Sequence, residues 1–261
     1  MSTVVVKVGG ALIEDARAIE AVWQGVGALR AEHEVVVVHG GGPQATALSR
    51  RLGHEPRIIA GRRITSDLGR DAVLWTVRGE LNARLVASAQ AAGLRAVGLS
   101  GVDGELVSVA RRPPVAVDGE AVDFGWVGDV VSADPAVLHT LLAAGFLPVV
   151  ASPCADREGN VYNVNADTVA LTLAEALGAE ALLLVAEAGG VYRDLADPGS
   201  LLGTVDSEAA EAGLAAGWIV GGMRVKLDVG FEALGRGVPS VRICAPGALA
   251  DDEAGTSLVA A

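Results

Sequence analysis

Two lysines are the residues in this chain whose chemistry stands out first. The 261 residues include 20 basic side chains, and all of them except Lys7 and Lys226 are arginines. Lys7 precedes the pair Gly9-Gly10, and Lys226 follows the pair Gly221-Gly222. A lysine ammonium is a compact point charge, whereas an arginine guanidinium is a wide planar fork. A narrow site that puts one positive charge on a phosphoryl group would accept lysine and reject arginine. The alternative is that both lysines are ordinary surface residues.

Glycine turns follow several short aliphatic runs that are typical of buried strands. The turns are Gly9-Gly10, Gly40-Gly41-Gly42 and Gly189-Gly190, after strands expected at residues 3–8, 34–39 and 181–185. Such turns can leave backbone N–H groups free to face an anion, although packing alone often explains one glycine pair. Neither lysine is followed by Ser or Thr, and no G-x-G-x-x-G pattern follows a strand. Phosphate binding would therefore use neither the P-loop nor the dinucleotide scheme.

The order strand, glycine turn, helix occurs twice near the start of the chain, which indicates a doubly wound α/β sheet. We expect helices at residues 14–32, 43–52, 67–92, 135–144, 165–177, 207–216 and 222–235. Further strands are expected at residues 96–99, 147–151, 241–244 and 257–259. Alternating runs within residues 106–130, broken by Pro113-Pro114, Asp118-Gly119 and Gly125, predict hairpins.

Composition narrows the class of protein. Hydrophobic residues make up 51% of the chain but aromatic residues only 3%, so the core must be aliphatic, as suits parallel strands buried on both faces. The net charge of -12 argues against nucleic acid or a strongly acidic protein as partner, while small anionic substrates remain possible. The two cysteines suggest neither a disulfide framework nor a zinc site. No apolar run of about 18 residues occurs, so we expect a cytoplasmic protein without a membrane partner.

Six ordered motifs resemble those of the amino acid kinase family. They are Lys7-Val-Gly-Gly, His39-Gly-Gly-Gly-Pro43, Gly61-Arg-Arg-Ile-Thr65, Val97-Gly-Leu-Ser-Gly101, Asn163-Val-Asn-Ala-Asp167 and Gly221-Gly-Met-Arg-Val-Lys226. The resemblance implies a three-layer α/β sandwich around a mainly parallel central sheet, as one domain over residues 1–261. It further implies an N-terminal lobe at 1–151 for substrate binding and dimerisation, and a C-terminal lobe at 152–261 for ATP binding.

Within that family the pattern is most similar to members that act in arginine biosynthesis. These members transfer a phosphoryl group from ATP to the γ-carboxylate of N-acetyl-L-glutamate, which gives N-acetylglutamyl 5-phosphate. The resemblance thus implies N-acetyl-L-glutamate and ATP as substrates and a homodimer as the assembly. Mg²⁺ is expected as the companion of ATP, held mainly by phosphates and water rather than by a metal site of the protein.

The resemblance also assigns roles to individual residues. Lys7 and Lys226 would contact the transferring phosphoryl group, and Asp167 would hold the two lysines in place. The expected substrate-binding residues are Gly41, Gly42, Arg63 and Asn163. The expected nucleotide-binding residues are Gly9, Gly10, Glu187, Gly190, Tyr192 and Gly221. Gly9, Gly10, Gly41 and Gly42 would offer backbone N–H groups along the path of the phosphoryl group and to the substrate.

These residue types suit the chemistry independently of the resemblance. A carboxylate nucleophile has a pKa of about 4.3 and is already ionised at neutral pH, so no general base is needed. The reaction instead needs charge neutralisation and the alignment of two anions that repel each other. Asp167 is therefore interpreted as an organiser of lysines; alternatively it is only an acid favoured by a helix dipole. We interpret His39 as a core histidine, and Asp103 and Asp129 as turn acids.

Some positions depart from the family pattern. Ala186-Glu187 replaces the Thr/Ser-Asp pair that often follows the nucleotide-site strand, and Asn82-Ala83 replaces Asn-Lys in the long helix. The chain begins almost directly at its first strand, whereas arginine-inhibited hexameric members carry an extra N-terminal helix. We therefore expect a dimer without arginine feedback.

Three other functions remain open. One is a kinase for aminoadipate or glutamate joined to an acidic carrier protein in lysine biosynthesis. Another is a non-catalytic sensor of an amino acid or nucleotide; the presence of both lysines and Asp167 argues against this function. A dinucleotide-dependent oxidoreductase is disfavoured, because the glycine fingerprint is absent after the first strand.

Overall fold

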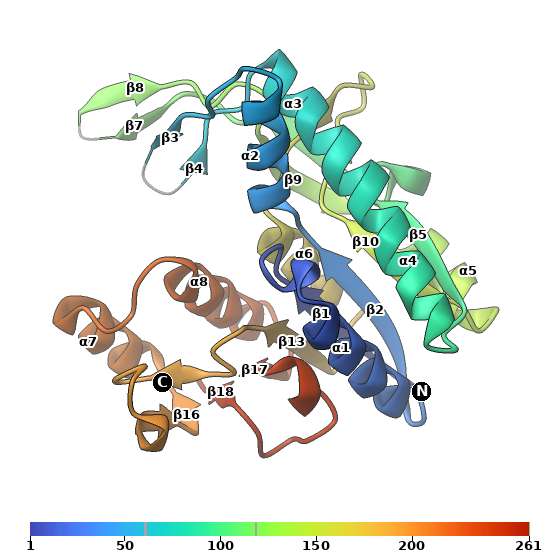
Figure 1. Cartoon of the computed structure of the whole chain (residues 1–261), viewed down its shortest axis with the longest axis vertical. Coiled ribbons are helices and arrows are strands. Elements are labelled where there is room, and N and C mark those ends of the chain that lie inside the picture. The colour runs from blue at the N-terminus through green and yellow to red at the C-terminus, as the bar shows by residue number, and fades with distance from the viewer. Residues whose placement is uncertain (60–61, 118, 261) are drawn as a thin grey trace.

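The computed structural model of the chain describes residues 1–59, 62–117 and 119–260, and its centre is an eight-stranded sheet (Figure 1). In sheet order the strands are β16 (Thr204–Val205), β18 (Thr256–Leu258), β17 (Ser240–Cys244), β13 (Ala181–Val185), β1 (Ser2–Val8), β2 (His33–His39), β10 (Leu147–Ala151) and β5 (Ala96–Ser100). All neighbouring strands are parallel except β17 and β18. The predicted mainly parallel sheet is confirmed.

Helices cover both faces of this sheet. On one face, side chains such as Val4 and Val6 of β1 join a core with α1 (Ala16–Leu29). On the other face, Val5 joins a second core with α5 (Ala136–Ala143), α6 (Ala166–Ala176) and α8 (Gly222–Gly235). Alternate residues of a strand point to opposite faces, so one valine-rich strand supplies both cores. The predicted three-layer sandwich is confirmed.

The long helix expected at residues 67–92 is present but is not uniform. It begins as α3 (Asp67–Val73), widens into a π-helix, η2 (Leu74–Leu81), and ends as α4 (Asn82–Ala91). Periodicity predicts that a segment is helical but not which carbonyl each N–H bonds, so the π segment was not foreseen. In the part of the chain that the structure describes, no helix is long and apolar enough to cross a membrane.

The expected hairpins form a second, smaller sheet beside the first. Its order is β12 (Val161–Tyr162), β11 (Cys154–Ala155), β6 (Val107–Arg111) and β9 (Gly128–Ala133), and β7 (Val115–Val117) pairs with β8 (Glu120–Val122). Two further hairpins were not predicted, because two-residue strands show no periodicity. They are β3 (Ile58–Ile59) with β4 (Arg62–Arg63), and β14 (Val191–Tyr192) with β15 (Leu201–Leu202). Gly61 and Asp118, both in predicted motifs, lie outside the described residues.

The remaining helical elements connect these layers. They are α2 (Gly42–Arg51), α7 (Ser207–Ala216) and the 3-10 turns η1 (Leu12–Glu14), η3 (Asp103–Glu105), η4 (Pro198–Ser200) and η5 (Pro246–Ala248). The predicted helices at residues 43–52 and 207–216 are confirmed by α2 and α7.

The carboxyl ends of five parallel strands are in register. Ser100 is paired with Ala151, Ala151 with His39, His39 with Val8, and Val8 with Val185. The segments that follow these residues therefore leave the sheet side by side, at its carboxyl edge. Ligand sites of open α/β sheets form at this edge.

Candidate active site

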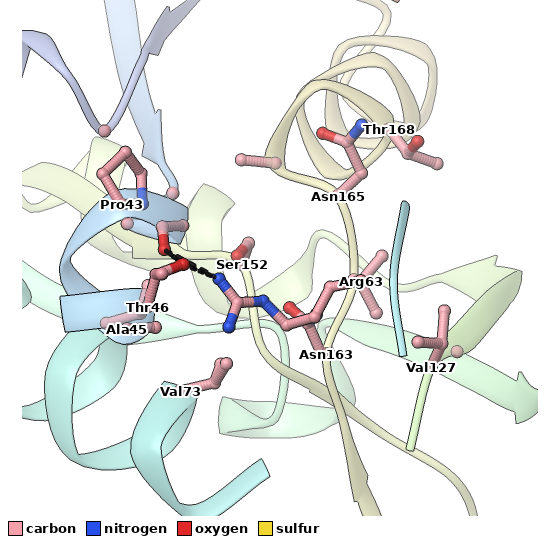
Figure 2. A pocket seen from close by; sticks show the side chains of 18 of the residues that line it. Pro43, Ala45, Thr46, Arg63, Val73, Val127, Ser152, Asn163, Asn165 and Thr168 are labelled. Carbon is pink, nitrogen blue, oxygen red and sulfur yellow. Dashed lines mark hydrogen bonds between the residues drawn. The ribbon is translucent and has the colours of Figure 1, made fainter. Parts of the chain in front are cut away.

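A cavity of about 570 Å³ lies at the carboxyl edge of the sheet, between the glycine turns and the small sheet (Figure 2). Its walls come from residues far apart in the sequence, including both halves of the chain. Six of the residues predicted from the sequence line this cavity: Lys7, Gly10, Gly41, Gly42, Arg63 and Asn163.

Lys7 and Asp167 form an ion pair next to the cavity. Lys7 points from β1, and only 5% of the residue is exposed; its Nζ lies 2.8 Å from Asp167 Oδ1. Asp167 sits in the first turn of α6, where the side chain of Asn165 caps the helix by accepting the Asp167 N–H. Asp167 Oδ1 has no hydrogen bond of good geometry among the described residues, so the contact is an ion pair rather than a linear hydrogen bond.

Lys226 projects from α8, which packs against α6. Burial lowers the pKa of Lys226, the charge of Lys7 lowers that pKa further, and the charge of Asp167 raises it. The structure therefore pairs Lys7 with Asp167 and carries Lys226 on a helix that packs against the helix of Asp167. Lys226 does not line the cavity itself.

The two glycine turns approach each other closely. A Cβ added to Gly10 would lie 3.1 Å from Gly41 Cα, and one added to Gly41 would lie 2.4 Å from Leu81 Cδ1. Gln44 Nε2 ties the turns together by donating to the Gly10 carbonyl over 2.7 Å. Since the first N–H groups of a helix have no partner within it, the N-terminus of α2, beginning at Gly42, offers anion-binding donors to the cavity.

Arg63 crosses the cavity toward α2, as Figure 2 shows. Its Nη2 donates to the Gly42 carbonyl over 2.9 Å and to Thr46 Oγ1, while its buried Nη1 has no partner among the described residues. Burial lowers the pKa of Arg63, and the nearby charge of Arg50 adds to this. Asn163 donates to Thr65 Oγ1 over 3.3 Å. An unpaired guanidinium donor in a cavity fits a carboxylate ligand.

The remaining residues predicted for the nucleotide do not line this cavity. Glu187 is exposed in the turn between β13 and β14, Tyr192 lies in β14, and Gly221 precedes α8 with a φ of 55° that suits glycine. Gly190 is packed instead: an added Cβ would lie 2.5 Å from Leu201 Cδ1. Gly9 has open space where a Cβ would stand.

Several residues that line the cavity were not predicted. They include Thr46, Arg112, Asp129, Ser152 and Thr168. Ser152 directly follows β10, so the strand-end reasoning applied to the glycine turns could have found it. No such signal marks Arg112, because the adjacent Arg111 looks equivalent in the sequence.

The interpretation of Asp129 as a turn acid is wrong. It lies within strand β9, and Arg112 Nη2 donates to its Oδ1 over 2.5 Å. Asp103, by contrast, accepts hydrogen bonds from the backbone and hydroxyl of Ser100 in a turn, as expected.

His39 is the core histidine that was predicted. The side chain is fully buried, its Nδ1 contacts the Gly40 carbonyl at 3.0 Å, and Asn82 Nδ2 lies 2.9 Å from its Nε2. These partners suit a neutral ring that donates from Nδ1 and accepts at Nε2. Burial lowers the pKa of His39 to about 4.

The acids near the cavity are already engaged by cations. Asp167 is paired with Lys7 and Asp129 with Arg112. No group of three His, Cys, Asp or Glu residues that could hold a metal occurs in the described ranges. This donor set fits a Mg²⁺ carried on phosphates and water better than a metal held in a protein cage.

The sequence matches a family model, described as the amino acid kinase family, over residues 2–245. The chain belongs to the amino acid kinase family. Two relatives of this kinase carry the name acetylglutamate kinase. The one from Anaeromyxobacter dehalogenans (strain 2CP-C) is 41% identical over 255 residues, which cover 93% of this chain and 91% of the relative. The one from Sorangium cellulosum is 42% identical over 243 residues, covering 92% and 85%.

Solved structures agree with the amino acid kinase fold. The structure of smu.665 from Streptococcus mutans superposes on this chain with a TM-score of 0.81 at 24% identity, and the match covers 98% of each chain. At that identity the likeness concerns the fold, and it accords with the predicted kinase architecture.

Proposed function

We propose that this chain uses ATP to phosphorylate the γ-carboxylate of N-acetyl-L-glutamate, which yields N-acetylglutamyl 5-phosphate for arginine biosynthesis. Relatives named acetylglutamate kinase, about 41% identical over most of the chain, support this. One structural observation carries the assignment: a single cavity is lined by both Lys7 and Arg63, whose buried Nη1 lacks a partner. A substrate with two carboxylates can satisfy both cations at once.

In this reaction the protein aligns two anions rather than moving a proton. The γ-carboxylate is ionised at neutral pH and attacks directly. Lys7 and Lys226 place positive charge on the transferring phosphoryl group, and Asp167 holds Lys7 by their ion pair. The N-terminus of α2 with Gly41 and Gly42 adds backbone donors. One preorganised donor of this kind is typically worth about 3–4 kcal/mol in the transition state.

The nucleotide is assigned to the neighbouring part of the carboxyl edge. Because β13 pairs with β1 in parallel, the segment after β13 leaves the sheet beside the glycine turn that carries Gly9 and Gly10. Glu187, Gly190, Tyr192 and Gly221 are proposed to line the ATP site there. Mg²⁺ would travel with ATP and neutralise phosphate charge.

The assembly and the lobes are further parts of the proposal. Residues 1–151 would bind the substrate and form a homodimer, and residues 152–261 would bind ATP, in the cytoplasm and without a nucleic-acid partner. Strand β5 ends the described sheet, and such an edge can meet a second chain. Sedimentation velocity should give a dimer; a monomer or hexamer would contradict this assignment.

One observation favours a second candidate, the kinase for a carrier-bound substrate. Residues 50–63 contain five arginines and a single acid, Glu55, in a chain of net charge -12, and Ile58 and Arg63 of this segment line the cavity. Arg51 and Arg57 are exposed, and neither forms an ion pair among the described residues. A local basic surface could attract an acidic carrier despite the overall charge.

Coupled ADP release separates the two candidates. The purified chain with MgATP should turn over free N-acetyl-L-glutamate, with L-glutamate and carrier-linked aminoadipate or glutamate as comparison substrates. Turnover of the carrier-linked substrate alone would favour the second candidate. Nucleotide binding without turnover of any of these substrates would indicate a sensor and contradict the kinase proposal.

A further inference from the structure

The cavity contains one charged pair that the proposed reaction does not use. Its charged lining side chains are Lys7, Arg63, Arg112 and Asp129, so Asp129 is the one acid among the described lining residues. An uncompensated carboxylate would repel a substrate with two negative charges. The presence of Asp129 therefore calls for a specific role.

Arg112 masks half of this carboxylate. Its Nε and Nη2 both donate to the same oxygen of Asp129, Oδ1, over 2.8 and 2.5 Å. Oδ2 accepts no hydrogen bond from any side chain or backbone group in the described ranges. The side chains of Arg112 and Asp129 are 19% and 46% exposed, so the pair is partly withdrawn from water. The pair thus offers the cavity a neutral unit with a free acceptor.

The backbone holds this pair beside Asn163. Arg112 N–H donates to the Val127 carbonyl over 2.9 Å, and Gly128 N–H donates to the Asn163 carbonyl over 3.1 Å. Asp129 therefore directly follows the residue whose N–H bonds the Asn163 carbonyl. The side chain of Arg112 also lies over the ring of the buried Phe124, at 6.0 Å from its centroid. These contacts fix the pair next to Asn163, which together with Arg63 is proposed to hold the α-carboxylate of the substrate.

The position of the pair indicates which substrate atom it meets. In an α-amino acid derivative, the α-nitrogen is attached to the same carbon as the α-carboxylate. If Arg63 and Asn163 hold that carboxylate, groups next to Asn163 face the nitrogen. An acylated nitrogen is neutral and has one N–H to donate, whereas a free amino group is a cation.

We infer that Arg112 and Asp129 select for an acylated α-nitrogen: Asp129 Oδ2 accepts its N–H, and Arg112 neutralises the carboxylate charge that would otherwise hold a free ammonium. This inference rests on the proposed function and adds two specificity residues to it. An ion pair suits this task, because Asp129 alone would attract an ammonium group and Arg112 alone would not accept an N–H.

Variants that remove one charge of the pair should change the inhibition constant of L-glutamate in opposite directions. Arg112→Met exposes the full charge of Asp129, so the inhibition constant of L-glutamate, competing with N-acetyl-L-glutamate, should fall at least ~10-fold. Asp129→Asn leaves Arg112 uncompensated, so the same constant should rise at least ~3-fold. The double variant should return to within about threefold of the unmodified chain, because both charges are gone.

A matched control is available one residue away. Arg111 forms a comparable ion pair with Asp123 at 2.8 Å but does not line the cavity. Arg111→Met should leave the inhibition constant of L-glutamate and the KM for N-acetyl-L-glutamate within twofold. The KM for ATP should remain within twofold in all variants, which a general structural defect would not allow.

Two results separate the inference from the proposed function. If Arg112→Met and Asp129→Asn change the L-glutamate constant in the same direction, or no more than Arg111→Met does, the selection role is wrong while the kinase assignment stands. If the unmodified chain does not phosphorylate N-acetyl-L-glutamate, the proposed function fails first. If Arg112→Met does not fold, Asp129→Asn decides alone: a rise in the inhibition constant of L-glutamate supports the selection role, and a fall or no change contradicts it.

Discussion

At the scale of single residues, burial explains why lysine rather than arginine stands at position 7. Lys7 is 5% exposed at the end of a central strand, and its ammonium has Asp167 at 2.8 Å. A guanidinium is wider and needs several partners, which this location does not provide. Lys226 is partly exposed and less confined, but the charges of Lys7 and Asp167 both act on it.

Replacing either lysine by arginine should therefore impair catalysis. Lys7→Arg and Lys226→Arg keep the charge but misplace it, and we expect kcat to drop at least ~100-fold in each variant. Coupled ADP release at saturating substrates measures this change. Near-normal kcat in one of the variants would mean that lysine has no special role at that position.

His39 should make stability depend on pH. The pKa of His39 is about 4 in the folded chain and about 6.5 when unfolded, so the unfolded state binds more protons between these values. Its contribution is complete above pH 6.5 and is lost as pH falls toward 4; at pH 5 the loss is about 2 kcal/mol. Denaturant unfolding of the unmodified chain and of His39→Gln at pH 7 and 5 checks this.

The exposed His139 supplies the control for that experiment. His139→Gln should keep the pH dependence of the unmodified chain, while His39→Gln should show a shallower loss between pH 7 and 5. Equal losses in all three proteins would show that buried His39 does not carry the effect.

At the scale of elements, the glycine turn after β2 is shaped by the π-helix beside it. A side chain at position 41 would collide with Val77 and Leu81 of η2, and α2 begins directly afterwards at Gly42. The turn, and with it the helix N-terminus that faces the cavity, is thus held by packing from a different element. Residue-level reasoning identified the glycines, but not the helix that requires them.

Replacing Gly41 or Gly42 by alanine should show whether packing against η2 is what requires a glycine in this turn. In Gly41→Ala the new Cβ would lie 2.4 Å from Leu81 Cδ1, and we expect a loss of about 1–3 kcal/mol in unfolding free energy. Gly42→Ala meets nothing within 4 Å in the first turn of α2, so stability should change by less than about 0.5 kcal/mol. Urea denaturation compares the two; equal losses would mean that η2 does not constrain the turn.

At the scale of the whole molecule, the central sheet carries both proposed sites on one edge. Strands β2, β10 and β5 lie on one side of β1, and β13, β17, β18 and β16 lie on the other. Strands β11 and β12 follow residue 151 but join β6 in the small sheet, on the side of the cavity. The strand pairing therefore crosses the boundary proposed for the lobes.

If the two sites are separate, their ligands should respond to different substitutions. Arg63→Ala should weaken binding of N-acetyl-L-glutamate at least ~10-fold and leave the Kd of a non-hydrolysable ATP analogue within twofold. Gly221→Ala should do the reverse, because a φ of 55° disfavours alanine and this turn is proposed to line the nucleotide site. Calorimetric titration measures both; loss of both ligands in either variant would contradict separate sites.

Much of this molecule follows from local pattern. Buried valine runs predicted the central strands, the helix expected at residues 165–177 is present as α6, and ordered motifs predicted six residues that line the cavity. The two-residue hairpins, the π-helix and Arg112 could not be predicted, because each depends on pairing or packing with distant residues. Asp129 was interpreted as a turn acid because it lies in a turn-rich segment, and nothing in the sequence links it to its partner Arg112, 17 residues away.

By itself, the sequence determined the alternation of strands and helices, the family, and which lysines deserve attention, since these depend on periodicity, glycine spacing and residue type. The sequence also predicted that Asp167 holds the lysines, and the structure adds that its ion pair is with Lys7. Only the tertiary structure decided that η2 leaves no room for a side chain at Gly41 and that Arg112 neutralises Asp129 inside the cavity. The physical reason is that strand register and packing set distances between residues far apart in the chain, and ion pairs depend on those distances.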